Sequence, residues 1–189
     1  MPSQDAMFLL DQQKCVVANF DSSGWILDIG GGGEGIIGRL KGSNVVAIDI
    51  RREELDEAPS GPLKLIMDAT NLQFLDHTFD TVTAFFSLMY FTHETRPQVF
   101  HEVARVLTPG GKFYLWDVTI PPATDPTKRV FAVLLNIQLP HETIQTGYGV
   151  TWQDREQTLD DYLQLGQETG LKVVSQQTTG HLFSIKFKK

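Results

Sequence analysis

Hydrophobic and polar positions alternate in blocks along this chain, and the blocks predict strands and helices in turn. Short continuous apolar runs are typical of strands that are buried on both faces, as in a parallel sheet. Segments with helical spacing separate these runs, and the order predicts a parallel α/β sheet with right-handed crossovers. The predicted strands cover residues 25–28, 45–49, 63–67, 80–86 and 112–119, and the predicted helices cover residues 36–42, 51–57 and 95–107.

The segment 95–107 is the clearest predicted helix. Its apolar residues recur at intervals of three and four and therefore fall on one face. Thr95 with Gln98 has the spacing of a capping box at its start. The sequence Thr-Pro-Gly-Gly at residues 108–111 ends it before the next strand.

The two ends of the chain depart from this alternation. Residues 1–20 have a loosely helical apolar spacing and predict an N-terminal helix. Residues 120–153 contain two alternating runs around a short turn, which predict an inserted antiparallel hairpin. A further helix over residues 154–169 is followed by two strands, 171–176 and 182–188, which are expected to pair antiparallel at the sheet edge.

Composition limits the class of protein. Residues 1–189 suffice for one sizeable core and are too few for two ordinary domains. The net charge of −7 lacks the broad positive field that phosphate backbones favour, so a nucleic-acid partner is not expected. Cys15 is the only cysteine, which excludes an internal disulfide and a cysteine-based zinc site. No membrane-spanning run or secretory signal is evident, so the cytoplasm is the expected location.

Three of the predicted strands end in an aspartate: Asp28, Asp49 and Asp68. The glycine run at residues 30–33 follows the first of them. In an open α/β sheet, ligands bind beyond the carboxyl ends of the strands, near the topological switch point. A nucleoside needs a close approach of backbone, an acceptor for its ribose hydroxyls and a partner for its base. The predicted rim offers all three.

The sequence Ile-Leu-Asp-Ile-Gly-Gly-Gly-Gly-Glu at residues 26–34 resembles the first motif of class I S-adenosylmethionine-dependent methyltransferases. Residues 107–113 resemble the turn into the fifth strand of that family. With the hairpin included, the expected fold is a Rossmann-like α/β fold. Its seven-stranded, mostly parallel sheet has helices on both faces and an antiparallel last strand. The resemblance also implies S-adenosylmethionine as the cofactor and methyl transfer to a small or medium-sized acceptor molecule.

The same resemblance assigns cofactor-binding roles. The glycine backbone would lie nearest the methionine half of the ligand, and Asp49 would accept hydrogen bonds from both ribose hydroxyls. Ile50 would pack on the adenine, whose amino group would face Asp68. The complete set of expected cofactor-binding residues is Asp28, Gly30, Gly31, Gly32, Asp49, Ile50, Asp68, Ala69, Phe86 and Ser87.

Position 34 departs from the family pattern. Glu34 stands where a third glycine is usual, and Gly33 and Gly35 flank it. Two interpretations follow: the turn is shifted by one residue, or Glu34 caps the helix that comes next.

No residue stands out as catalytic. A sulfonium methyl group is already activated, so transfer depends above all on alignment, and a base is needed only if the acceptor must lose a proton. Tyr90, His93 and Asp117 are the candidates, although His93 equally suits a solvated position before a helix and Asp117 a turn or ion pair. No His, Asp or Glu set has convincing metal-ligand spacing, so no metal is expected.

Two other functions stay open. A nicotinamide-dependent oxidoreductase shares the glycine turn and the acid after the second strand, but this chain contains no Tyr-x-x-x-Lys sequence. A non-catalytic S-adenosylmethionine-binding regulatory protein would carry the same motifs as an enzyme. The hairpin over residues 120–153 is expected either to cover the acceptor or to form the arm of a homodimer.

Overall fold

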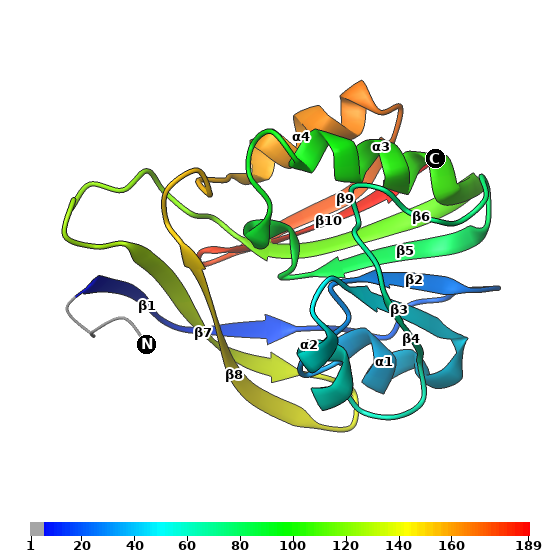
Figure 1. Cartoon of the computed structure of the whole chain (residues 1–189), viewed down its shortest axis with the longest axis horizontal. Coiled ribbons are helices and arrows are strands. Elements are labelled where there is room, and N and C mark those ends of the chain that lie inside the picture. Colours follow the sequence, from blue (N-terminus) through cyan, green and yellow to red (C-terminus); the bar gives the residue numbers. More distant parts are fainter. Residues whose placement is uncertain (1–5) are drawn as a thin grey trace.

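A seven-stranded sheet forms the centre of the protein in the computed structural model, which describes residues 6–189 (Figure 1). The strand order is β4-β3-β2-β5-β6-β10-β9. β10 runs antiparallel to both of its neighbours, and the other strands share one direction. The expected mostly parallel sheet with an antiparallel last strand is confirmed. The strands are β2 Ile26–Ile29, β3 Val45–Asp49, β4 Leu63–Ile66, β5 Phe79–Phe85, β6 Leu107–Val118, β9 Lys172–Thr179 and β10 Leu182–Lys188.

Helices cover both faces of this sheet, as expected. α3 and α4 pack on one face, where Phe100 and Tyr162 join the apolar cluster of the sheet. α1 and α2 lie on the opposite face, where Ile37 and Leu55 join a second cluster. Two short 3-10 turns, η2 and η3, complete the helical elements. The bounds are α1 Ile36–Lys41, α2 Arg52–Glu57, α3 Arg96–Val106, α4 Leu159–Glu168, η2 Gly42–Asn44 and η3 Leu88–Tyr90.

The expected capping box at the start of α3 is wrong. Thr95 has helical backbone angles, φ −94° and ψ −25°, and its hydroxyl accepts a hydrogen bond from Thr92 N instead of from the first turn. A cap requires an extended backbone, which Thr158 has at the start of α4. There the Thr158 and Asp161 side chains each bond to the other's backbone N–H, which forms a capping box.

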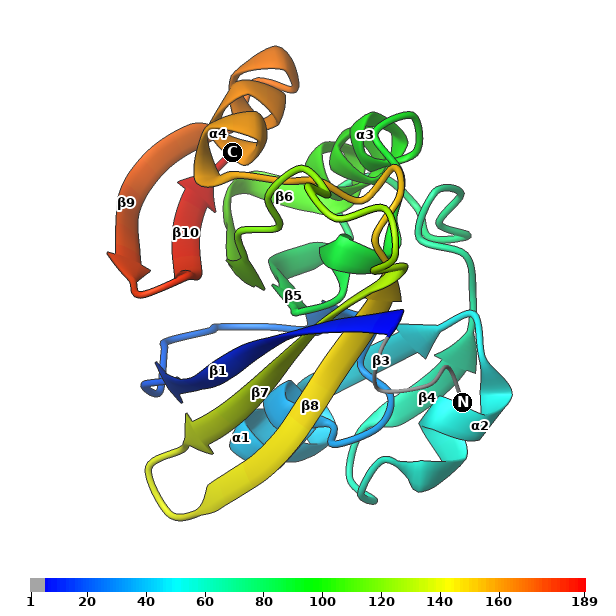
Figure 2. The same ribbon diagram turned by 90° about the vertical axis from the view of Figure 1, so that its left-hand side faces the viewer.

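A second, three-stranded sheet of order β1-β7-β8 lies beside the first (Figure 2). β7 (Val130–Gln138) and β8 (Thr143–Thr151) pair antiparallel, which confirms the inserted hairpin. β1 (Met7–Val16) pairs parallel with β7. The expected N-terminal helix over residues 1–20 is therefore wrong, although residues 1–5 of it lie outside the described part. The edge of β7 offers hydrogen-bond partners to the backbone of residues 7–16. These bonds outweigh the weak helical preference of that segment.

The second sheet packs on the carboxyl end of β5. Its inner side chains Val133, Leu135 and Ile137 are fully buried, in one cluster with Phe85 and Phe86 from the end of β5. The hairpin is thereby held over the edge where the parallel strands end. Across residues 6–189 no helix has both the length and the apolar character needed to cross a bilayer.

Candidate functional site

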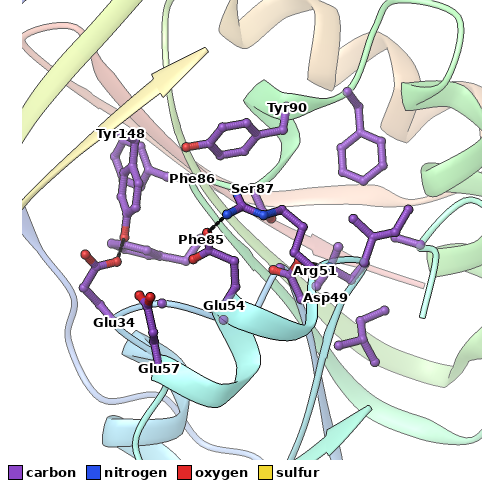
Figure 3. Close-up of a pocket in the computed structure, with 18 of the residues that line it drawn as sticks. Glu34, Asp49, Arg51, Glu54, Glu57, Phe85, Phe86, Ser87, Tyr90 and Tyr148 are labelled. Atoms are coloured by element: carbon purple, nitrogen blue, oxygen red, sulfur yellow. Dashed lines mark hydrogen bonds and ion pairs between the residues drawn. The ribbon is translucent and has the colours of Figure 1, made fainter. Parts of the chain in front are cut away.

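A cavity of about 610 Å³ opens at the carboxyl ends of the parallel strands (Figure 3). The carboxyl ends of β2, β3 and β5 and the segments after β2, β3, β4 and β5, including α2 and η3, form most of its wall. Strand β8 of the second sheet also contributes to it. The side chains and backbone that line it belong to Ile29, Gly30, Gly32, Gly33, Glu34, Ile48, Asp49, Ile50, Arg51, Glu54, Glu57, Met67, Asp68, Ala69, Phe85, Phe86, Ser87, Tyr90, Phe91, Gly147, Tyr148 and Gly149.

The glycine loop after β2 lies too close to its neighbours for side chains. Gly30 has φ +69°, and a Cβ added to it would overlap the Ser87 side chain. A Cβ on Gly32 would lie 2.5 Å from Glu54 Cβ and 3.0 Å from Asp49 Oδ2. Glycine at both positions lets the loop fold tightly and present bare backbone to the cavity.

Asp49 and Asp68 are held at the cavity rim by the turns that follow their strands. Asp49 Oδ1 accepts a hydrogen bond of 2.9 Å from Arg51 N. Asp68 Oδ1 accepts hydrogen bonds from both the backbone N and the hydroxyl of Thr70, at 2.9 and 2.8 Å. These local bonds hold the two carboxylates in place, and both residues still line the cavity. Beside them, Ile50 is 67% exposed, which leaves an apolar surface at the rim.

Asp28 and Gly31 lie beneath the cavity and are absent from its lining. Asp28 is buried and accepts a 2.7 Å hydrogen bond from the Thr83 hydroxyl. Burial raises the pKa of Asp28 to about 7, although the Thr83 hydrogen bond opposes the shift. A Cβ on Gly31 would meet Asp28 Oδ2 at 2.7 Å and Ala47 Cβ at 2.8 Å. Asp28 therefore supports the glycine loop at Gly31.

Sequence comparison decides between the possible nucleoside-binding families. Residues 27–115 match the family described as "Methyltransferase domain". These residues, just under half of the chain, form a methyltransferase domain. The matched segment spans β2 to β6, which carries the glycine loop and both rim aspartates. A methyltransferase domain implies S-adenosylmethionine as the cofactor, and it does not favour the nicotinamide-dependent alternative.

Curated relatives share part of this methyltransferase. The biotin biosynthesis bifunctional protein BioHC of Cellvibrio japonicus is 36% identical over 105 residues, which are 52% of this chain and 20% of that protein. The methyltransferase GfsG of Streptomyces halstedii is 36% identical over 88 residues, 43% of this chain and 30% of that protein. The matches thus cover less than a third of the length of either relative.

Solved structures agree on the fold. An S-adenosylmethionine-dependent methyltransferase from Methanosarcina mazei superposes with a TM-score of 0.66 at 20% identity. The match covers 90% of this chain and 94% of that one. At this identity the likeness establishes the Rossmann-like architecture and leaves the acceptor unspecified.

The cavity of the methyltransferase has the features that its cofactor requires. Bare glycine backbone, a rim carboxylate and an exposed isoleucine line the same cavity. The Ser87 hydroxyl is buried beside Gly30 and has no hydrogen-bond partner among the described residues. Five carboxylates and one guanidinium line the cavity, and the guanidinium of Arg51 is paired with Glu54 at 2.9 Å. The excess of negative charge suits a ligand with a sulfonium and an ammonium group.

The three catalytic candidates occupy different environments. Tyr90 lines the cavity, and burial raises the pKa of its hydroxyl to about 12. His93 lies outside the lining, with its Nε2 3.8 Å from an oxygen of Glu156. Asp117 is buried and also outside the lining. It accepts a 3.1 Å hydrogen bond from Met89 N and thereby holds η3 against the end of β6.

Several lining residues escaped the sequence reasoning. Glu54 and Glu57 lie three residues apart on α2, a spacing that places both on one helix face. Glu34 has a signal in the sequence, because a charged residue that interrupts a glycine run is unusual and marks the position for attention. Tyr148 and its two glycine neighbours had no local signal, because only the packing of the hairpin brings them to the cavity.

Proposed function

We propose that this methyltransferase transfers the methyl group of S-adenosylmethionine to a small or medium-sized acceptor that binds beneath the β7–β8 hairpin. The observation that carries the proposal is a shared cavity: Gly147–Gly149 of the hairpin line the same space as Gly30 and Asp49. The hairpin is then an acceptor cover. The inner apolar side chains of the hairpin are already buried against the seven-stranded sheet of the same chain. Few of them are therefore left to pack on a second subunit as a homodimer arm.

Within this proposal the rim residues hold the cofactor. Asp49 accepts hydrogen bonds from the ribose hydroxyls, and Ile50 packs on the adenine. Asp68 and the Ala69 amide face the polar edge of the base, while the backbone of Gly30 and its neighbours contacts the methionine half. Support comes from the presence of all these groups in the lining of one cavity. Asp28 contributes indirectly, by supporting the loop.

The bound cofactor supplies an activated methyl group on a positive sulfur. The chain supplies alignment, which in well-oriented reactions is worth about 7–11 kcal/mol. A tyrosine hydroxyl is protonated near neutral pH even with its ordinary pKa of about 10, and burial raises the pKa of Tyr90 further, so its hydroxyl orients an acceptor instead of removing its proton. The hairpin and the aromatic wall at Phe86 exclude water from the acceptor side.

Calorimetric titration with S-adenosylhomocysteine and with NADH tests the cofactor. We expect binding of S-adenosylhomocysteine alone.

Asp49→Ala removes the ribose acceptor. Because a hydrogen bond to a charged group contributes about 1.5–3 kcal/mol, affinity for S-adenosylhomocysteine should fall roughly 10- to 100-fold. Asp56→Ala is the matched control, since Asp56 is an exposed carboxylate on α2 that does not line the cavity. Unchanged affinity in folded Asp49→Ala would remove Asp49 from the site.

Catalysis is tested separately from binding. Release of S-adenosylhomocysteine from S-adenosylmethionine, measured across a panel of small alcohols, amines and carboxylic acids, identifies an enzyme and rejects the non-catalytic alternative. Binding without release on any acceptor, in a panel that also includes metabolite extracts, would favour a regulatory protein.

A further inference from the structure

Glu34 occupies a sharp turn between the glycine loop and α1. Gly33 and Gly35 on either side of it both have φ +56°, a conformation that glycine adopts readily. Gly35 is the N-cap residue of α1, and no side chain caps the helix. The expectation that Glu34 caps α1 is therefore wrong, and its carboxylate points away from the helix toward β8 (Figure 3).

Both oxygens of this carboxylate are used by the hairpin. The Tyr148 hydroxyl donates to Glu34 Oε2 at 2.9 Å, and the Thr146 hydroxyl donates to Oε1. Tyr148 and Thr146 are two residues apart and so share one face of β8. The side chain directly after the glycine loop thus binds a strand residue that is 114 positions away in sequence.

A second contact joins the same segment to the hairpin turn. Arg39 of α1 donates through Nε to the Glu34 backbone O at 2.7 Å, and its Nη1 lies 3.1 Å from Glu142 Oε2. Exposed ion pairs of this kind contribute little. The partly buried, charge-assisted bonds of the Glu34 carboxylate are the stronger link between loop and hairpin.

The position of the hairpin sets the shape of the acceptor side. The Tyr148 ring stacks on Phe86 at a centroid distance of 5.6 Å and an angle of 26°. The backbone of Gly149 interacts with the Tyr90 hydroxyl on η3. β8 therefore contacts both Glu34, through Tyr148 and Thr146, and Tyr90, through the Gly149 backbone.

We propose that Glu34 is a positioning residue that couples cofactor binding to closure of the acceptor pocket. A ligand that fixes the backbone of Gly30–Gly33 also fixes the turn at Glu34, and the Glu34 carboxylate then holds Tyr148 in place as the acceptor wall. Cofactor binds first and completes the acceptor pocket. By thermodynamic reciprocity, a bound acceptor tightens cofactor binding by the same factor. The coupling rests on the proposed function, because it requires the cofactor to lie on the glycine loop.

Hydrogen exchange of the β8 amides, with and without S-adenosylhomocysteine, tests the coupling in the full chain. In the wild type we expect the ligand to slow exchange in residues 143–151. Glu34→Gln and Tyr148→Phe should each remove most of this ligand-dependent slowing, because roughly 10- to 100-fold in local opening depends on one charge-assisted bond. Both variants should still bind S-adenosylhomocysteine. The double variant should lose little more than Glu34→Gln alone, since the bond that Tyr148→Phe removes is one of the two that the Glu34 carboxylate accepts from the hairpin.

Glu57→Gln is the matched control. It removes a carboxylate from the same cavity, and among the described residues Glu57 forms no hydrogen bond to the hairpin. Ligand-dependent slowing should persist in it. The coupling is overturned if Glu34→Gln speeds exchange equally in the free and bound states, which is what a merely structural contact would do. It is also overturned if the wild type binds the ligand with no change in β8. Absence of ligand binding by calorimetry would instead overturn the proposed function.

Discussion

At the scale of single residues, the site depends on positions without a side chain as much as on its polar side chains. A Cβ at position 30 would overlap the Ser87 side chain, and a Cβ at position 31 would overlap Asp28 and Ala47, so both positions require glycine. Phe86, directly after β5, takes φ +48°, an uncommon value for a side chain of this size. Strained backbone of this kind clusters at functional sites, and here it lies in the cavity wall.

Gly30→Ala should both unfold the protein more easily and weaken cofactor binding. The positive φ alone costs about 1–2 kcal/mol, and the overlap with Ser87 adds about 1–3 kcal/mol. Gly170→Ala is the control, since Gly170 also has a positive φ, of +76°, but has no neighbour within 4 Å of an added Cβ. Urea unfolding of both variants measures the difference. Equal losses would show that the close approach at Gly30 does not matter.

Asp28→Asn should change the pH dependence of stability. Burial raises the pKa of Asp28 to about 7 in the folded state, so between about pH 4 and 7 the folded chain binds a proton that the unfolded chain has lost. The contribution of Asp28 is therefore greatest at low pH and is lost as pH rises through 7. Asparagine keeps the acceptor for Thr83 and removes the ionisation.

The measurement is the free energy of unfolding of wild type and Asp28→Asn at about pH 5 and about pH 8. The variant should gain stability relative to the wild type at the higher pH. Asp56→Asn, at an exposed position on α2, should show no such trend. A constant difference between Asp28→Asn and wild type across this range would contradict a raised pKa.

At the scale of elements, the strands and helices with strong periodicity formed where the sequence predicted them, to within a few residues. β1 did not. Its residues 7–16 have no strict alternation, but in the fold Leu10 and Cys15 face inward and are buried. Pairing with β7 decides the conformation of this segment, since long-range hydrogen bonds outweigh weak local preference.

Cys15 reports on the docking of β1. Burial raises the pKa of its thiol to about 12, so near pH 8 its thiolate fraction is roughly 1000-fold below that of an exposed cysteine. Iodoacetamide should therefore label the native protein very slowly and the urea-unfolded protein quickly, as followed by mass spectrometry. Native labelling at the unfolded rate would mean that β1 is detached in solution.

At the scale of the whole molecule, two sheets meet at the carboxyl edge of β5, and the cavity lies between the main-sheet loops and β8. A ligand in this cavity contacts both sheets only when the chain is folded. Binding to the native state alone raises stability by mass action.

S-adenosylhomocysteine at about 100 times its Kd should stabilise the fold by about 2.7 kcal/mol, which for a chain of this length corresponds to a rise in Tm of about 5–10 °C. Differential scanning fluorimetry measures the shift. NADH at the same concentration should leave Tm unchanged. A shift with NADH alone would reverse the assignment of the cofactor.

The sequence by itself determined the alternation of strands and helices, the glycine loop and the two rim aspartates. These features depend on periodicity and on strand ends, and parallel strands bring their carboxyl ends to one edge. Only the tertiary structure decided that Asp28 lies under the loop, that β1 is a strand and that Glu34 binds Tyr148. Each of these outcomes depends on contacts between segments that are distant in the sequence, such as β1 with β7 or Glu34 with Tyr148, and no local pattern encodes the geometry of such contacts.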